Sequence, residues 1–182
     1  MLDAAQAWAL LESADCICPP EEISATLDRL AAEIRADYAD AQPLLLSVMG
    51  GAVVFTGQLV PRLNFPLELD YIHATRYGSA LSGAEVDWRV LPGAHVAGRS
   101  VLVLDDILDE GRTLAAVCDK VREMGAASVR CAVFAEKQRD GDKPLRAEYV
   151  GLTLPDRFVF GFGMDVHGWW RNLPAIYALR QC

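Results

Sequence analysis

The sequence has few of the features that mark membrane, secreted or nucleic-acid-binding proteins. No run of about 18 apolar residues occurs, so no segment is expected to span a membrane. The first residues carry no basic leader, which argues against a secretory signal and favours a cytoplasmic location. Because 17 Lys and Arg face 25 Asp and Glu, the net charge is −8, and nucleic acid is not an expected partner.

Cysteine and histidine are too sparse and scattered to indicate a disulfide framework or a zinc site. The chain has five cysteines, an odd number that fits free thiols in a reducing compartment. Cys16 and Cys18 form a Cys-x-Cys pair, but no second pair follows at the spacing that a closed zinc site requires. A Walker-type phosphate loop, GxxxxGK followed by Ser or Thr, is also absent.

What the sequence does contain is an alternation of apolar strands and amphipathic helices. At 182 residues with 52% hydrophobic residues, the chain is expected to form one domain with a sizeable core. Helices are predicted at residues 19–40, 52–63 and 111–125, and strands at residues 43–49, 67–78, 99–106 and 128–137. Since the strands are almost continuously apolar, the pattern predicts an α/β fold with a mostly parallel sheet covered by helices.

The stretch VLVLDDILDEGRTL, residues 101–114, sets an apolar strand directly against a cluster of acids. Gly111, Arg112 and Thr113 open the following helix, whose N-terminal N–H groups and hydroxyl suit a phosphate. The acids that precede this helix start can accept hydrogen bonds from hydroxyl groups or bind a hard metal ion, and one of them can take a proton. A phosphate cradle beside hydroxyl acceptors suits a sugar phosphate.

Two other interpretations of this loop remain open on the residues alone. The acids can form a solvated turn that caps the helix. A phosphoacceptor-type α/β domain also carries a pair of aspartates at a strand end, but there the pair follows the first strand. Here about a hundred residues precede it.

The acidic stretch resembles the phosphoribosyl pyrophosphate (PRPP) signature of type I phosphoribosyltransferases. The C-terminal part resembles the 6-oxopurine branch of that family, the hypoxanthine-guanine phosphoribosyltransferases. The matching elements, in order, are a lysine at a strand end, KP, YVG, PDRFV, GFGMD and RNLP. The resemblance extends from about Leu44 to Leu179.

This resemblance implies a fold and a reaction. The expected fold is that of type I phosphoribosyltransferases, one domain over residues 1–182. Its core would span about residues 40–140, and a small hood would comprise about residues 141–182 plus the N-terminal helices. The expected enzyme transfers the 5-phosphoribosyl group from PRPP to N9 of hypoxanthine or guanine, with Mg²⁺, giving IMP or GMP and diphosphate. The expected assembly is a homo-oligomer, a dimer or a tetramer.

Two alternatives to that function stay open: a xanthine-preferring enzyme, and a regulatory relative that senses PRPP or a purine mononucleotide.

The resemblance also implies roles for the residues of the acidic loop. Asp109 would be the catalytic residue, which takes the N7 proton of the purine while N9 attacks the sugar. The ribose and 5′-phosphate of PRPP would be bound by the rest of the loop: Asp105, Asp106, Glu110, Gly111, Arg112 and Thr113.

Residues outside the loop would complete the site. The diphosphate would meet Met49, Gly50, Gly51 and Arg171. The purine would meet Lys137, Phe158 and Val159, and Mg²⁺ would meet Asp165 together with Asp105 and Asp106. Arg76 and Tyr77 would belong to a lid, and a non-proline cis peptide is expected between Val48 and Met49. Because Met49 stands where many relatives have a cation, diphosphate binding would rely on backbone amides and Arg171.

Overall fold

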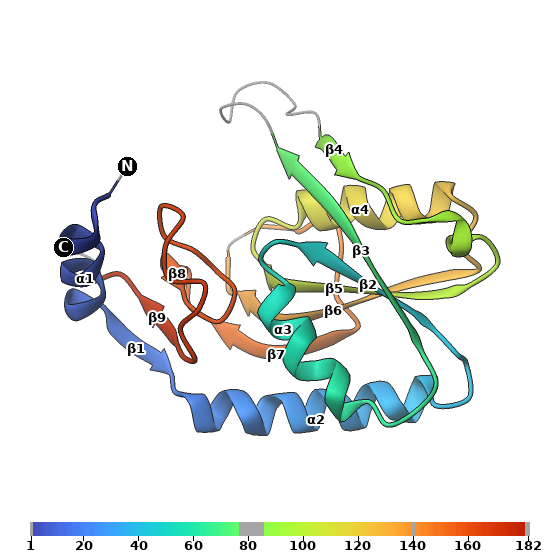
Figure 1. Cartoon of the computed structure of the whole chain (residues 1–182), viewed down its shortest axis with the longest axis horizontal. Coiled ribbons are helices and arrows are strands. Elements are labelled where there is room, and N and C mark those ends of the chain that lie inside the picture. Colours follow the sequence, from blue (N-terminus) through green and yellow to red (C-terminus); the bar gives the residue numbers. More distant parts are fainter. Residues whose placement is uncertain (1, 77–85, 140, 181–182) are drawn as a thin grey trace.

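A six-stranded sheet forms the centre of the computed structural model, which describes residues 2–76, 86–139 and 141–180 (Figure 1). Its strands lie in the order β4-β3-β2-β5-β6-β7, and all except β4 run parallel. Their bounds are β2 (Leu44–Met49), β3 (Glu68–Arg76), β4 (Val86–Val90), β5 (Ser100–Leu108), β6 (Ser128–Lys137) and β7 (Tyr149–Leu154). This arrangement confirms the predicted α/β fold with a mostly parallel sheet.

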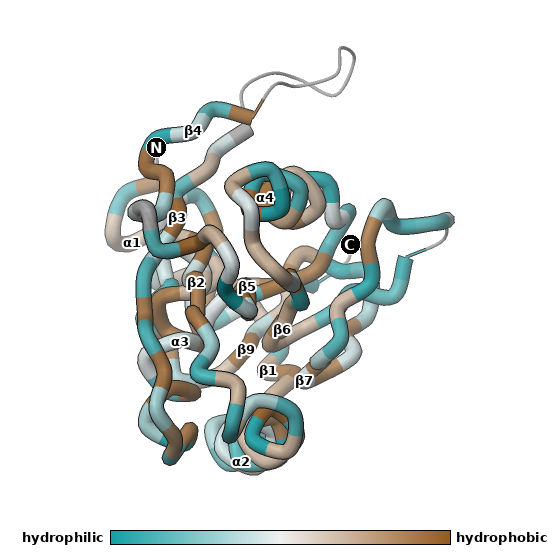
Figure 2. Tube along the Cα trace, turned by 90° about the vertical axis from the view of Figure 1, so that its right-hand side faces the viewer, coloured by the Kyte–Doolittle hydropathy of each residue, from teal (hydrophilic) through white to brown (hydrophobic). Residues whose placement is uncertain are grey.

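Helices cover both faces of this sheet. The helices α2 (Pro20–Tyr38) and α3 (Val53–Leu59) pack on one face, and α4 (Arg112–Glu123) packs on the other (Figure 2). Along β2, Leu45 faces α2 and α3, whereas Leu44 and Leu46 face α4, because successive strand side chains point to opposite faces. Both faces are therefore buried, which explains the continuous apolar runs in the sequence.

The start and the buried face of helix α2 agree with its sequence pattern. It begins directly after Pro19, with Pro20 at its first position and the acids Glu21 and Glu22 in its first turn, where the helix dipole favours negative charge. Its buried side chains recur at helical spacing: Ile23, Leu27, Leu30, Ile34 and Tyr38. No helix of the described residues is long and apolar enough to cross a bilayer.

A second, three-stranded antiparallel sheet forms the hood, and it joins the two ends of the chain. Its order is β1-β9-β8, with β1 (Asp15–Cys18), β8 (Val159–Phe160) and β9 (Ile176–Ala178) (Figure 1). Arg157 Nη2 donates to Asp15 Oδ2 at 2.6 Å and so connects the two ends directly. The short helix α1 (Ala4–Ser13) joins this unit, because Trp170 Nε1 donates to the Ala7 carbonyl oxygen at 3.0 Å.

The hood does not begin at about residue 141, where the resemblance predicted its start. The strand β7 lies in the segment that the resemblance assigned to the hood, yet it pairs with β6 in the main sheet. Tyr149 and Leu154 of β7 are buried in the core that α2 covers. The hood sheet therefore begins after residue 154, and of the two N-terminal helices only α1 is part of the hood. Two 3₁₀ turns, η1 (Val60–Arg62) and η2 (Ala94–Val96), complete the described elements.

Aromatic packing connects the hood to the core. Phe134 of β6 lies between Phe55 of α3 and Phe162 of the hood, with ring centroids 5.7 Å and 4.4 Å away. All three side chains are fully buried. Because aromatic pairs gain about 0.5–1.5 kcal/mol beyond the burial of their surface, this stack holds the hood over the end of β6.

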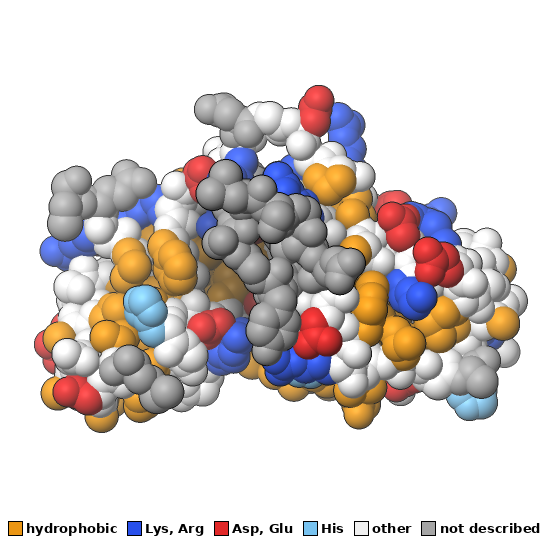
Figure 3. All heavy atoms as spheres, turned by 90° about the horizontal axis from the view of Figure 1, so that it is seen from above, with side chains coloured by type: hydrophobic (Ala, Val, Ile, Leu, Met, Phe, Trp, Pro, Cys, Tyr) orange, Lys and Arg blue, Asp and Glu red, His pale blue; other side chains and the backbone are white. Residues whose placement is uncertain are grey.

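Charges of both signs are mixed on the described surface. In Figure 3, Lys and Arg side chains lie next to Asp and Glu side chains, with hydrophobic side chains between them. The described part of this face shows no continuous basic patch of the kind that binds a nucleic-acid backbone.

Candidate active site

Two adjoining cavities open at the carboxyl ends of the strands. From β2 the chain continues outward to β3, whereas from β5 it continues in the opposite direction to β6 and β7, so the switch point of the sheet lies between β2 and β5. Ligands of open α/β sheets bind at such switch points. The larger cavity, about 360 Å³, lies there, and a smaller cavity of about 190 Å³ lies between the end of β6 and the hood.

The two cavities share a wall. Asp106, Ile107, Asp109 and Arg171 line both of them. The larger cavity is also lined by Met49, Gly51, Asp105, Glu110, Gly111, Arg112 and Thr113, and the smaller one by Lys137, Phe158, Val159 and Asp165. The fold thus brings almost all predicted site residues together, and of those whose side chains are described only Gly50 lines neither cavity.

The N-terminus of α4 forms one side of the larger cavity. Gly111 precedes the helix with φ 77°, a left-handed conformation that glycine adopts without cost. The N–H groups of the first helical turn and the dipole of α4 favour an anion at this position. Arg112 adds a cation, and its Nε lies 3.7 Å from Glu110 Oε2, so the carboxylate nearest the helix start is paired.

Asp105 and Asp106 lie in β5 itself, because the strand extends to Leu108 alongside β6. Burial raises the pKa of both carboxyl groups, and the charge of Asp106 adds to this effect at Asp105. The Ile107 N–H donates to Asp106 Oδ1 at 2.8 Å. Two partly buried acids side by side are stabilised by a cation or by hydroxyl donors, so this part of the cavity suits a sugar or a metal ion.

A glycine turn after β2 faces Asp106 across the cavity. The cis peptide bond of this turn joins Met49 and Gly50, so the predicted position between Val48 and Met49 is wrong by one residue. In a cis peptide the flanking Cα atoms approach to about 2.9 Å, and glycine on one side removes the substituent that would crowd this contact. Any side chain at Gly51 would overlap the Asp106 carboxylate, which explains a glycine there.

The hood contributes Arg171, whose orientation is set by a tight turn. Its Nη1 donates to the Gly163 carbonyl oxygen at 2.7 Å, and its Nη2 lies 2.5 Å from Asp165 Oδ1. Asp165 is held in turn by the Gly168 N–H, 2.7 Å from Oδ2. The Arg171 guanidinium therefore lines both cavities in a preset position.

The predicted metal ligands do not form a cage by themselves. Asp105 lines only the larger cavity and Asp165 only the smaller one. No group of three or more His, Cys, Asp or Glu side chains within the described ranges could hold a metal ion. Two carboxylates of β5 beside an anion cradle nevertheless fit Mg²⁺, which typically binds one or two carboxylates and completes its shell with substrate oxygens and water.

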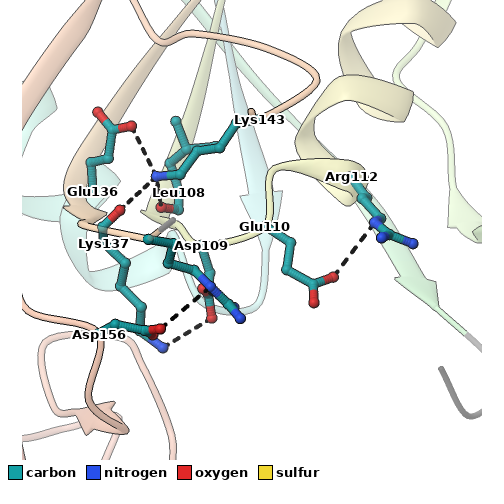
Figure 4. A network of polar contacts seen from close by, with 9 residues as sticks. Leu108, Asp109, Glu110, Arg112, Glu136, Lys137, Lys143 and Asp156 are labelled. Carbon is teal, nitrogen blue, oxygen red and sulfur yellow. Dashed lines mark hydrogen bonds and ion pairs between the residues drawn. The ribbon is translucent and has the colours of Figure 1, made fainter. Parts of the chain in front are cut away.

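Asp109, in the shared wall, is held by two cations. Lys137 Nζ donates to Asp109 Oδ2 at 2.9 Å, and Arg139 Nη1 donates to Asp109 Oδ1 at 2.8 Å (Figure 4). Burial raises the pKa of Asp109, but the hydrogen bonds from Arg139 and Lys137 outweigh burial and hold this pKa below its ordinary value. Asp109 is therefore ionised at neutral pH and able to accept a proton.

The smaller cavity has a partly apolar lining. Phe158 is 52% exposed and lies at the cavity together with the buried Val159. The Lys137 side chain is only 11% exposed. An aromatic face beside a nearly buried ammonium suits a planar ligand that carries a hydrogen-bond acceptor.

Two residues near the site, Arg139 and Lys143, were not predicted from the sequence. Most of the predicted lid lies outside the described residues. Arg139 stands two residues after Lys137, but nothing in the sequence placed it beside Asp109. Lys143 belongs to the KP element, which carried no role by itself. Of the predicted lid, Arg76 ends β3, while its side chain and all of Tyr77 lie outside the described residues.

Comparison with known proteins agrees with this geometry. Residues 19–167 match the family model described as the phosphoribosyl transferase domain. This chain belongs to the phosphoribosyltransferase family. It is 34% identical over 161 residues to the hypoxanthine-guanine phosphoribosyltransferase of Bacillus subtilis, covering 88% of this chain and 89% of that one.

Other similar proteins differ from this chain in length to different degrees. The "Bifunctional protein TilS/HprT" of Listeria innocua is 34% identical over 88% of this chain, which spans only 25% of that protein. A crystal structure of a hypoxanthine phosphoribosyltransferase from Staphylococcus aureus superposes with a TM-score of 0.86 at 25% identity, covering 94% of this chain and 95% of that one. This phosphoribosyltransferase therefore shares its fold with the 6-oxopurine enzymes.

The contact between the hood and the glycine turn predicts the effect of Gly163→Ala. A Cβ at this position would overlap the Gly51 carbonyl oxygen, and φ is 102°, so the hood must move away from the turn. We expect kcat/KM for phosphoribosyl transfer to fall about 10–100-fold, because small displacements of positioning groups cost that much.

Gly168→Ala is the matched control for this variant, since φ is 87° there but no atom lies within 4 Å of the added Cβ. It should lose similar stability and keep kcat/KM within about two-fold. Equal kinetics of the two variants would show that the hood contact does not position the site.

Proposed function

We propose that this phosphoribosyltransferase is a purine salvage enzyme that transfers the 5-phosphoribosyl group from PRPP to N9 of hypoxanthine or guanine. The products are IMP or GMP and diphosphate. The observation that carries the proposal is the position of Asp109, an ionised carboxylate in the wall between an anion-binding cavity and a partly apolar one. A base at this border can act on a purine in one cavity while the purine attacks a sugar in the other.

PRPP fits the larger cavity in one orientation. Its 5′-phosphate would be bound by the N–H groups of residues 109–113 and the Thr113 hydroxyl at the N-terminus of α4. Its ribose hydroxyls would donate to Asp105 and Asp106, whose raised pKa values reflect burial without a donor of that kind. The diphosphate would lie toward Met49, Gly50 and Gly51, where Arg171 supplies the positive charge that Met49 does not.

The carboxylates of β5 support Mg²⁺ as the cofactor of this reaction. Asp105 and Asp106 would hold the ion together with oxygens of PRPP, and Asp165 would bind through its water shell. When bound, Mg²⁺ would neutralise negative charge on the β5 carboxylates and on the leaving diphosphate. Without the ion, two acids and a diphosphate would meet in one cavity and repel each other.

A 6-oxopurine fits the smaller cavity. Phe158 would stack on the ring, the backbone of Val159 would meet its edge, and Lys137 would donate to O6. Lys137 Nζ donates to Asp109 Oδ2, so a purine whose O6 takes this donor would leave Asp109 Oδ2 ready for the N7 proton. Adenine carries a donor at position 6 and would be rejected by the ammonium.

The transfer then needs little from the protein beyond position and charge. Diphosphate leaves C1′ of the ribose, N9 of the purine attacks the oxocarbenium-like centre, and Asp109 accepts the N7 proton. The carboxylates of the larger cavity stabilise the positive charge that develops on the sugar. Arg76 and Tyr77 would close over the centre and exclude water, whose attack would waste PRPP.

We also propose the setting in which the enzyme works. The whole chain would act as one domain in the cytoplasm, in a dimer or tetramer of identical chains. Leu69 and Tyr71 support self-association, because these large side chains lie on the same face of β3 and are 53% and 44% exposed. Light scattering in solution measures the mass of the assembly and would contradict this proposal by showing a monomer.

The decisive experiment supplies the protein with PRPP and one base at a time, with and without Mg²⁺, and separates the products by chromatography. We expect IMP from hypoxanthine and GMP from guanine, no product from adenine, and no product without Mg²⁺. Xanthosine monophosphate as the main product would favour the xanthine-preferring alternative. PRPP binding without product from any base would favour a regulatory relative.

Replacement of the proposed general base, Asp109, distinguishes an effect on turnover from an effect on PRPP binding. Asp109→Asn should lower kcat about 100-fold or more, because general base catalysis typically contributes 10²–10⁴. The dissociation constant for PRPP with Mg²⁺, measured by calorimetry, should stay within about three-fold, since the amide keeps the shape of the loop. Loss of PRPP binding together with turnover would contradict the role of Asp109.

Replacement of the proposed purine donor tests specificity. Lys137→Met should raise KM for hypoxanthine about ten-fold or more, because a hydrogen bond from a charged donor is lost. The informative measurement is the ratio of kcat/KM for hypoxanthine to kcat/KM for adenine, which should fall. The lost contact with Asp109 affects both bases alike, so an unchanged ratio would exclude Lys137 from purine recognition.

A further inference from the structure

Lys143 makes three hydrogen bonds at the junction of β5 and β6. Its Nζ donates to the Lys137 carbonyl oxygen at 2.7 Å, to Glu136 Oε1 at 2.9 Å and to the Leu108 carbonyl oxygen at 3.2 Å (Figure 4). An ammonium group has three donors, so all of them are used. Only 14% of the Lys143 side chain is exposed.

The two carbonyl groups belong to the peptide units next to the site. Leu108 is the last residue of β5, and its carbonyl group is part of the peptide that leads to Asp109. The Lys137 carbonyl group ends β6, one residue beyond the last register pair of β5 and β6, Leu108 with Glu136. Lys143 therefore links β5 and β6 at the point where their backbone pairing ends. The side chains that follow line the two cavities.

Glu136 makes this arrangement electrically neutral. Lys137 and Arg139 already contribute two positive charges around Asp109. A third ammonium nearby would repel them, but the Glu136 carboxylate pairs with Lys143 at 2.9 Å. The pair can thus hold the backbone without adding net charge to the site.

The segment after Lys143 supports the phosphate-binding side as well. A Cβ placed on Gly111 would meet Pro144 Cδ at 3.5 Å, which shows that Pro144 packs directly behind the start of α4. Lys143 and Pro144 therefore contact the backbone on both sides of Asp109. Neither residue lines the two cavities of the site, although both line a separate cavity of about 200 Å³ that also borders Asp109. The three hydrogen bonds of Lys143 end on Glu136 and on backbone carbonyl groups, so its contact with the site passes through the backbone.

We propose that Lys143 is a positioning residue that sets the distance between the general base Asp109 and the purine-binding Lys137. The inference rests on the proposed function, since it assigns Asp109 and Lys137 to two sides of one reacting purine. The Lys143 ammonium binds the carbonyl groups next to Asp109 and Lys137. The Asp109 carboxylate can then reach N7 of the purine while the Lys137 ammonium reaches O6 of the same ring. Loss of this contact lets the ends of β5 and β6 separate, and the two groups no longer fit one base.

Lys143→Met tests the proposal, because methionine keeps most of the apolar stem and removes all three donors. We expect kcat with hypoxanthine to fall about 100-fold, the loss that a displacement of about 1 Å can cause. KM for hypoxanthine should rise, whereas KM for PRPP should stay within about three-fold. A residue that only stabilises the fold would lower the melting temperature and leave kcat of the folded enzyme unchanged.

Lys120→Met on α4 is the matched control. Its ammonium pairs only with Glu123 on the helix surface, at 3.1 Å, and it lies outside both cavities. The same substitution there should leave kcat and both KM values within about two-fold. Wild-type kcat and KM in a folded Lys143→Met enzyme would overturn the proposal.

Lys143→Arg covers the case in which the methionine variant does not fold. Arginine keeps the charge opposite Glu136, but its planar fork cannot direct three donors from one nitrogen toward three converging acceptors. We expect a folded enzyme whose kcat is about ten-fold lower, and wild-type kcat would overturn the proposal.

The wild-type enzyme, assayed in parallel, separates this inference from the proposed function. No nucleotide from wild-type protein would refute the function itself, whereas an active wild type with unaffected variants would refute only the role of Lys143.

Discussion

The site depends on one constraint, the parallel alignment of β5 and β6 up to their last residues. With Leu108 opposite Glu136, the two strands end side by side, and Asp109 and Lys137 meet although 28 residues separate them in sequence. Because strand side chains alternate between faces, a shift of the register by one residue would turn Lys137 to the other face of the sheet. The close-packed cores on both faces oppose such a shift, since it would exchange side chains of different size between two packed faces. The packing of the core therefore also fixes the position of Asp109 relative to Lys137.

The carboxylates of the acidic stretch separate into two electrostatic environments. Burial raises the pKa values of Asp105 and Asp106, and the positive charge of Arg171 offsets this effect at Asp106 only in part. Asp109, only three residues further, has a lowered pKa because Arg139 and Lys137 donate to both of its oxygens. Two acids that suit a cation or hydroxyl groups thus lie within four residues of one that stays ionised, a separation that fits the proposed division between sugar binding and proton transfer.

The hood completes the site with residues from the far ends of the chain. Arg157 joins the C-terminal segment to Asp15, and Trp170 docks on α1, so the N-terminal helix helps to place the turn that carries Arg171. In the structure Trp170 packs within the chain against Trp8, with ring centroids 4.9 Å apart. The close approach of Gly163 to the turn after β2 then brings Arg171 to the cavity where a diphosphate would lie.

The sequence alone indicated the main helices and strands of the large sheet, the family, and most of the residues that line the two cavities. Strand and helix periods depend on local sequence, and the acidic stretch and the C-terminal motifs are contiguous, so both can be recognised without a structure. The border of the hood, the position of the cis peptide and the partners of Asp109 could not be recognised in this way. The hood border depends on the pairing of β7 with β6, and the partners of Asp109 depend on the end of β6 lying beside the end of β5. Such contacts arise between segments distant in sequence, and only tertiary packing decides them.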